Sequence, residues 1–138
     1  MGLSHIGLPV GDHYVEMRDF YKAILAPLGY ELVEEGDGEH TYCGFGTKNA
    51  GPDFWLGGGS PGGLQKYDGK LESRIAPMHV AFNGRDTAHV DEWYEVAIKA
   101  GAIDNGKPGP RPQYMKGYYG AFVLDPLGNN IECIHLTF

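Results

Sequence analysis

Three residues of this chain could together bind a metal ion: His5, His79 and Glu132. The two histidines stand 74 residues apart and open segments that read alike, HIGL at 5–8 and HVAF at 79–82. Each segment precedes a helical pattern with aromatic residues at nearly equal offsets, so one supersecondary unit is used twice, and its equivalent positions should face a shared centre. Glu132 adds a carboxylate inside an otherwise apolar strand. Two histidines and one carboxylate can hold a divalent metal and leave coordination positions open for chemistry.

The composition limits the possible partners. With 138 residues, 42% of them apolar, the chain suits one compact domain. A net charge of −7 without a cluster of Lys or Arg argues against nucleic acid and anionic membranes, and no apolar run is long enough for a membrane span. The N-terminus lacks the regions of a signal peptide, and the distant cysteines Cys43 and Cys133 read as reduced, buried thiols. We therefore expect a cytoplasmic protein with a small-molecule substrate.

The elements that would position these residues follow in order along the first half, about residues 1–58. A strand is expected at 3–9, and a helix then starts from Asp12 as the N-cap and is ended by Pro27 and Gly29. Met17, Phe20 or Tyr21, Ile24 and Leu28 recur at helical spacing as its apolar face. Further strands are expected at 30–34, 41–46 and 53–57.

The second half, about residues 76–138, repeats this order after a glycine-rich linker at about 59–75. A strand is expected at 77–82, and a helix capped by Asp86 or Thr87 and stopped by Gly101. A loop rich in Pro and Gly should cover 104–116, before strands at 118–124 and 130–136. The pattern predicts an α+β fold of two βαβββ modules, which form a cupped mixed sheet with helices on its outer face.

Strand alternation places the three candidate ligands on one side of their strands. His5 shares a face with Gly7, and His79 with Ala81, whereas the neighbouring residues on the other face are apolar. Glu132 likewise lies opposite Ile131 and Cys133. Small residues beside the candidate ligands leave room for a metal or a substrate. His13, His40 and His89 are expected on the surface, and the parity of His135 puts it outside the site.

A second group of residues could bind or protonate a substrate. Tyr114, Tyr118 and Tyr119 cluster near Arg111 and Lys116. They could form a packed aromatic strand with solvated charges, or a pocket wall in which tyrosine hydroxyls act as acids or hydrogen-bond donors. We take Tyr114 and Tyr119 as candidate catalytic residues, and Tyr118, Arg111 and Lys116 as candidate substrate-binding residues. Phe54 and Trp55 could be core residues or could line the substrate site.

The sequence resembles the vicinal oxygen chelate superfamily, which includes glyoxalase I, extradiol dioxygenases and bleomycin-resistance proteins. The resemblance covers nearly the whole chain and is carried by HIGLPVGD at 5–12, RDFYKAILAPLGY at 18–30, HVAF at 79–82 and GAFVLDPLGNNIE at 120–132. It implies paired βαβββ modules around a divalent metal such as Fe, Mn, Ni or Zn. By position, His5, His79 and Glu132 match the metal ligands. It also implies a homodimer, since chains this short often complete their sheets or sites by pairing.

One departure from the family pattern bears on the reaction. Glyoxalase I enzymes generally take a fourth ligand from the last strand of the first module, where this chain has Trp55, and an indole cannot ligate a hard divalent metal. Asp53 shares its parity but follows Pro52 at the strand edge. A three-ligand set is more similar to the dioxygenase branch, so dioxygenase-like chemistry is slightly favoured over that of a lactoylglutathione lyase. The alternative is a metal-free protein that sequesters an aromatic ligand, as in bleomycin resistance.

Overall fold

The computed structural model describes residues 2–36, 41–57 and 78–137, and these form two compact units. The first comprises Met1–Lys22 and Gly29–Ala76, and the second comprises Ala23–Leu28 and Pro77–Phe138. The expected linker at about 59–75 lies outside the described residues, so the predicted module boundaries stay a prediction. The last residues of the first helix cluster with the second unit, which the sequence pattern did not indicate.

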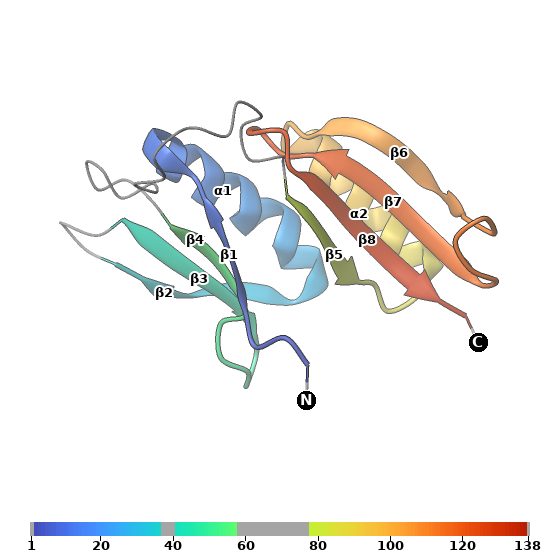
Figure 1. The fold of residues 1–138 in the computed structure, drawn as a ribbon, viewed down its shortest axis with the longest axis horizontal. Helices are drawn as coiled ribbons and strands as arrows, with labels where there is room; N and C mark the ends of the chain where they lie inside the picture. Colours follow the sequence, from blue (N-terminus) through green and yellow to red (C-terminus); the bar gives the residue numbers. More distant parts are fainter. Residues whose placement is uncertain (1, 37–40, 58–77, 138) are drawn as a thin grey trace, which may run out of the picture. The chain divides into compact units, whose positions relative to one another are not determined.

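The first unit has the order strand, helix and three strands (Figure 1). Its mixed sheet has the strand order β1-β4-β3-β2, in which β1 and β4 are parallel. The elements before and after its long helix are β1 (Ile6–Pro9), η1 (Gly11–His13), α1 (Tyr14–Leu25), η2 (Ala26–Leu28), β2 (Tyr30–Glu35), β3 (Tyr42–Thr47) and β4 (Phe54–Gly57). The expected N-cap, Asp12, lies instead inside the 3-10 turn that precedes α1. The expected apolar face of α1 is confirmed, because Met17, Tyr21 and Ile24 are fully buried.

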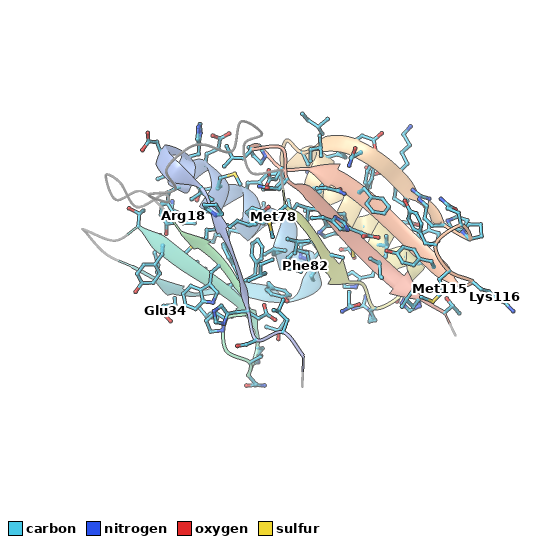
Figure 2. All side chains as sticks on the ribbon, viewed as in Figure 1. Arg18, Glu34, Met78, Phe82, Met115 and Lys116 are labelled. Atoms are coloured by element: carbon cyan, nitrogen blue, oxygen red, sulfur yellow. The ribbon has the colours of Figure 1, made fainter. Side chains whose placement is uncertain are left out.

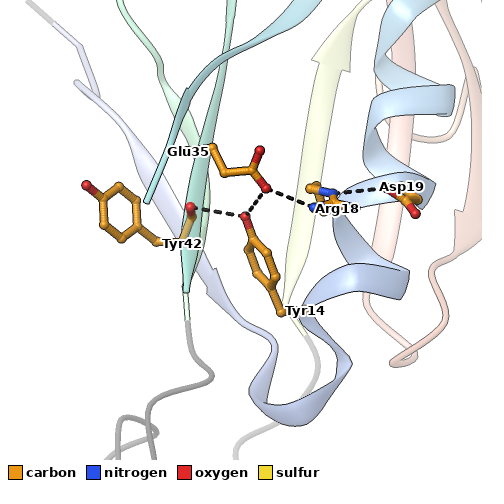
Figure 3. Close-up of polar contacts among 5 residues, drawn as sticks. All are labelled: Tyr14, Arg18, Asp19, Glu35 and Tyr42. Atoms are coloured by element: carbon orange, nitrogen blue, oxygen red, sulfur yellow. Dashed lines mark hydrogen bonds and ion pairs between the residues drawn. The ribbon is translucent and has the colours of Figure 1, made fainter. Parts of the chain in front are cut away.

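A polar network joins α1 to the neighbouring strands β2 and β3 of the first sheet (Figure 3). The single hydrogen of the Tyr14 hydroxyl is shared between Glu35 Oε1 at 2.9 Å and the carbonyl of Tyr42 at 3.1 Å, and Arg18 Nη1 donates to the same Glu35 oxygen at 2.9 Å. Burial and hydrogen bonds to Cys43 and Glu35 raise the pKa of Tyr14, while the bond from Arg18 lowers the pKa of the Glu35 carboxyl. These contacts hold the helix on the sheet and leave no reactive group free, so we read the network as structural.

The second unit repeats the same order of elements (Figure 1). Its mixed sheet has the order β5-β8-β7-β6, in which β5 and β8 are parallel and α2 covers one face. The elements are β5 (His79–Asn83), α2 (Thr87–Lys99), β6 (Ile103–Pro110), β7 (Tyr118–Leu124) and β8 (Asn130–Leu136). The N-cap is Asp86, whose Oδ1 accepts from the backbone N–H of His89 at 2.8 Å, and the helix stops before Gly101, whose φ is +101°. The α+β class with two βαβββ modules is confirmed.

The segment expected as a loop at 104–116 contains strand β6, which is the one missing strand of the second module. Its prolines and glycines argue against a central strand, but β6 lies at the sheet edge, where Pro is tolerated. It pairs with β7 through two register shifts, at Asp104/Gly106 and Gly106/Gly109. The periodicity is broken by these shifts, which is why the sequence pattern reads as a loop.

Candidate functional site in the second unit

The candidate site lies on the face of the second sheet opposite α2. Along β5, Val80 and Phe82 are buried toward the helix, whereas His79 is exposed on the other side. Along β8, Ile131 and Cys133 face the helix, so Glu132 projects from the same side as His79. Glu132 is nevertheless only 2% exposed, and a carboxylate at such a position requires partners.

Glu132 has two partners, one for each carboxylate oxygen. Oε2 lies 3.2 Å from Nε2 of His79, and Oε1 accepts a short hydrogen bond from the Tyr118 hydroxyl. Burial, followed by this bond to Glu132, raises the pKa of Tyr118, so its phenol keeps the proton that it donates. The arrangement has room because residue 120 is glycine: a Cβ there would lie 3.0 Å from Glu132 Oε1 and 3.1 Å from Tyr118 Cε1.

The other nitrogen of His79 determines what Nε2 can do. Nδ1 lies 3.0 Å from the backbone carbonyl oxygen of Asn130. A carbonyl oxygen only accepts, so Nδ1 must carry a hydrogen, and Nε2 of a neutral imidazole then has a lone pair. That lone pair faces a carboxylate oxygen, an arrangement that needs a cation between the two atoms or a proton on Nε2. Metal-binding histidines commonly donate their second ring N–H to a backbone carbonyl in this way.

The turn before β8 positions His79. The buried carboxylate of Asp125 accepts from the backbone N–H groups of Leu127 and Asn129 and from the Asn129 side chain, at 2.8–2.9 Å. Asn129 Oδ1 in turn accepts from the backbone N–H of Met78 at 3.0 Å. The DPLGN motif is therefore a structural clamp that holds the start of β5, and hence His79, against β8.

The first unit has an indole at the position that corresponds to Glu132. In the second unit Glu132 pairs with Ala81, two residues after His79, and in the first Trp55 pairs with Gly7, two residues after His5. Trp55 lies over β3, where a Cβ on Gly44 would come within 2.9 Å of its ring. His5 is exposed, just before β1, with Nδ1 3.1 Å from the hydroxyl of Ser4. The two modules thus share a register but differ in chemistry at this position.

The model of the glyoxalase/bleomycin resistance protein/dioxygenase superfamily matches residues 2–133. The chain belongs to this superfamily. No curated protein matches the sequence.

Solved structures of the superfamily share the fold. A glyoxalase/bleomycin resistance protein/dioxygenase family enzyme from Burkholderia phytofirmans PsJN superposes with a TM-score of 0.75 at 21% identity, covering 99% of this chain and 100% of that one. A domain of the same description from Frankia sp. EAN1pec gives 0.70 at 22% identity, with 99% and 98% covered. A glyoxalase-related enzyme from Fulvimarina pelagi gives 0.67 at 21% identity, with 100% and 98% covered. At these identities the likeness establishes the fold alone.

Most of the other candidate site residues of this superfamily member lie away from His79 and Glu132. Phe54 is 1% exposed and packs on Tyr21 with ring centres 4.8 Å apart, so its place is in the core, the first of the two alternatives that the sequence left open. Tyr119 lies on the helix-facing side of β7, where its hydroxyl donates to Asp91 at 2.7 Å. Lys116 lies at the end of the β6–β7 hairpin (Figure 2). By contrast, Tyr114 lies beside Tyr118, with ring centres 5.4 Å apart.

His89 is not the surface residue that the helix pattern predicts. It is 7% exposed, its Nδ1 accepts from the backbone N–H of Arg85 at 3.0 Å, and its Nε2 donates to the carbonyl of Pro27 at 2.5 Å. The η2 turn contributes that carbonyl, and a contact with a turn 62 residues away in sequence leaves no local signal. His135 has its Nδ1 3.2 Å from the carbonyl of Gly84, in agreement with its placement outside the site.

Superfamily members often use divalent metals, and His79 with Glu132 fits such an ion by its donor chemistry. Within residues 2–36, 41–57 and 78–137, however, no group of three or more His, Cys, Asp or Glu residues forms a metal site. The predicted third ligand, His5, belongs to the first unit. The structure therefore brings together two of the three predicted ligands, and the role of His5 stays a prediction.

The site also includes residues that the sequence analysis did not propose. Phe122 is the cross-strand neighbour of Glu132, and its ring stacks with that of His79 at 6.3 Å between centres. Asn130 supplies the carbonyl that orients His79. Parity alone could have identified Phe122, since Tyr118, Gly120 and Phe122 occupy every second position of β7 and so share one face.

Proposed function

We propose that this protein is a metal-dependent enzyme of the glyoxalase/dioxygenase type, whose small substrate binds the metal through two neighbouring oxygens. One observation carries the proposal: Nε2 of His79 lies 3.2 Å from the buried carboxylate of Glu132, while Nδ1 of the same ring is bonded to the carbonyl of Asn130. His79 is held by a backbone carbonyl and Glu132 by the Tyr118 hydroxyl, and a neutral imidazole nitrogen held this close to a carboxylate oxygen favours a cation bound by both atoms. In the part of the chain that the structure describes, no helix is long and apolar enough to cross a membrane. We place the enzyme in the cytoplasm, where its free, buried cysteines would stay reduced.

The proposed ligands are His79 and Glu132, with His5 as the third. A bound Fe, Mn, Ni or Zn ion would act as a Lewis acid on the substrate oxygens. Tyr118 holds one oxygen of Glu132 and so orients the carboxylate. Tyr114 has a half-exposed ring beside Tyr118, and we assign it the role of hydrogen-bond donor or acid toward a substrate oxygen. Tyr119 bonds to Asp91 on the helix side of the sheet, so we do not assign it a role toward a substrate bound at His79 and Glu132.

The choice of reaction rests on Trp55. Its register position matches that of Glu132, and an indole supplies no ligand to a hard metal. With three protein ligands, more coordination positions stay open for substrate and a co-substrate such as dioxygen. We therefore rank a dioxygenase above a lyase of the lactoylglutathione type.

A second function is supported by the same contact. A proton on Nε2 would make His79 an imidazolium and complete an ion pair with Glu132, so that the site needs no metal. In that state the exposed aromatic residues would serve a binding protein of the bleomycin-resistance type, which sequesters an aromatic ligand. The two functions differ in what neutralises Glu132, and metal affinity separates them.

The test is titration of metal-free protein with Zn, Mn, Ni and anaerobic Fe(II) by calorimetry. We expect wild-type protein to bind one ion per chain, and His79→Gln and Glu132→Gln to lose at least about tenfold in affinity. The matched control is His135→Gln, another sheet histidine bonded to a carbonyl through Nδ1, but on the opposite face. A His5→Gln variant measures whether the third ligand is the one proposed.

Each outcome has a clear consequence. If wild-type protein binds no ion more tightly than Glu132→Gln, the enzyme proposal fails and the binding protein is favoured. If His5→Gln binds as well as wild type while His79→Gln does not, His5 leaves the ligand set. Equal losses in His79→Gln and His135→Gln would show that the effect is structural.

A further inference from the structure

The face of the second sheet that carries Glu132 also carries a cluster of aromatic rings, from β5, from β7 and from the segment that joins β6 to β7. Phe122 is at its centre, with the ring of Tyr114 6.4 Å away at a near-perpendicular angle and that of His79 6.3 Å away. The guanidinium of Arg111 also lies over Phe122, 5.7 Å from the ring centre. The imidazole of His79 and the guanidinium of Arg111 thus both lie beside the Phe122 ring. One small molecule could therefore contact both groups.

Glycines on β6 make room for this cluster. A Cβ on Gly109 would lie 3.1 Å from Arg111 Nη1, and a Cβ on Gly106 would lie 3.0 Å from Phe122 Cδ2. On β7, Gly120 does the same for Glu132 and Tyr118. Three strand positions without side chains thus border the carboxylate, the aromatic ring and the guanidinium. The guanidinium occupies a defined place on this face.

Arg111 is held by neutral groups. Its Nη2 donates to the carbonyl of Lys107 at 2.6 Å and its Nη1 to the carbonyl of Pro110 at 3.2 Å. Arg18 and Arg85 each contact a carboxylate, but among the described residues Arg111 has no such ion pair. Carbonyls orient a guanidinium without neutralising it, and two of its five N–H donors are used. The remaining donors and the full positive charge stay available on a protein whose net charge is −7.

We propose that Arg111 binds an anionic oxygen group of the substrate, so that the substrate is a planar or aromatic compound carrying a carboxylate in addition to its two neighbouring oxygens. The inference rests on the proposed function for the position of the neighbouring oxygens, at His79 and Glu132. Phe122 and Tyr114 would contact the planar or aromatic part of the substrate, which joins the carboxylate to the two neighbouring oxygens. A guanidinium whose orientation is set in advance binds a carboxylate through a charge-assisted pair of hydrogen bonds.

The experiment compares two probes that differ only in the carboxylate, 3,4-dihydroxybenzoate and catechol. Binding of each is measured by calorimetry to zinc-loaded and to metal-free protein. We expect wild type to prefer the carboxylate probe by about tenfold or more. Arg111→Met should bring the ratio close to one, and Arg111→Lys should keep part of it. The control Arg85→Met removes the same charge from an exposed position of the same unit and should keep the full ratio.

A second variant guards against misfolding of Arg111→Met. Gly109→Ala keeps the charge but displaces Nη1, so it should lower the preference while leaving the binding of catechol unchanged. The proposal is overturned if wild type shows no preference, if Arg111→Met retains it, or if Arg85→Met loses as much. The effect of zinc is read separately: if zinc strengthens neither probe, the proposed function fails, while the ratio in metal-free protein still tests Arg111.

Discussion

At the scale of single residues, Glu132 is the position where charge and burial conflict. Its side chain is only 3% exposed, and each oxygen has one polar partner, Tyr118 or His79. A buried carboxylate that loses a donor keeps the full cost of desolvation, whereas the net gain from an ordinary hydrogen bond is smaller. The hydroxyl of Tyr118 should therefore contribute measurably to stability as well as to the orientation of the carboxylate.

Tyr118→Phe tests this contribution directly. We expect the free energy of unfolding of metal-free protein to fall by about 1–3 kcal/mol, because one oxygen of Glu132 loses its donor. Urea denaturation measures the change. The neighbouring Tyr119→Phe is the matched control, since its hydroxyl bonds to Asp91 at an exposed position, and it should cost less. Equal losses in the two variants would contradict a special role for the bond to Glu132.

Single residues also mark where sequence reasoning succeeded and where it could not. Alternation along a strand correctly placed Glu132 and His79 on one face, since it needs only the parity of each residue. The same parity argues against Phe54 and Tyr119 as site residues, because both alternate with residues of the site face. The tautomer of His79, by contrast, depends on a backbone carbonyl on a neighbouring strand, and the sequence carries no sign of that contact.

At the scale of elements, the second helix is fixed at its start by a histidine. His89 accepts from the backbone of Arg85 and donates to the carbonyl of Pro27, so it joins the first turn of α2 to η2. Its backbone N–H is bonded to the capping carboxylate of Asp86. A residue that appeared to be a solvated helix position therefore carries three hydrogen bonds.

Removal of the imidazole should leave two backbone groups without partners. We expect His89→Ala to lower the free energy of unfolding by about 1–3 kcal/mol for this reason. Urea denaturation measures it, with His13→Ala as the control, because that side chain is 58% exposed and its loss should change stability by at most about 0.5 kcal/mol. A His89→Ala protein as stable as His13→Ala would show that water replaces both partners.

Elements with regular periodicity were predictable, and the irregular one was not. Strands β7 and β8 have the expected bounds, 118–124 and 130–136, because each is a largely apolar run next to turn residues. Val90, Trp93 and Ala97 recur at helical spacing along α2, and all three are fully buried. Strand β6 exists because β7 offers it an edge to pair with, and this tertiary contact overrides the low strand propensity of its Pro and Gly residues.

At the scale of the whole molecule, each sheet has two edge strands, β1 and β2 in the first and β5 and β6 in the second. Backbone groups on the outer side of an edge strand lack a ladder partner within their own sheet, and pairing with another strand satisfies them. Members of the superfamily bind small molecules and often form dimers. We therefore expect this chain to form a homodimer.

Sedimentation equilibrium at micromolar concentration should give a mass of twice 15.1 kDa. Substitution of Gly7 in the edge strand β1 by proline removes a backbone N–H donor. If β1 takes part in the pairing, the measured mass should shift toward that of one chain. The same change at Gly2, an exposed residue before β1 whose φ is not positive, is the control. A single-chain mass for wild type, together with intact binding of ligand, would contradict the prediction.

The close contact between Gly120 and Glu132 should make these two positions change together among relatives of this protein. It is glycine because the carboxylate of Glu132 and the ring of Tyr118 fill the space a side chain would take. The constraint comes from the neighbours and not from the backbone, so it should vanish when they do. In relatives that have replaced the carboxylate by a small apolar residue, position 120 is released and larger residues can accumulate there. A family alignment should therefore show the columns of residues 120 and 132 changing together. The pair of residues at these columns would then distinguish relatives that retain the acidic ligand from relatives that have lost it.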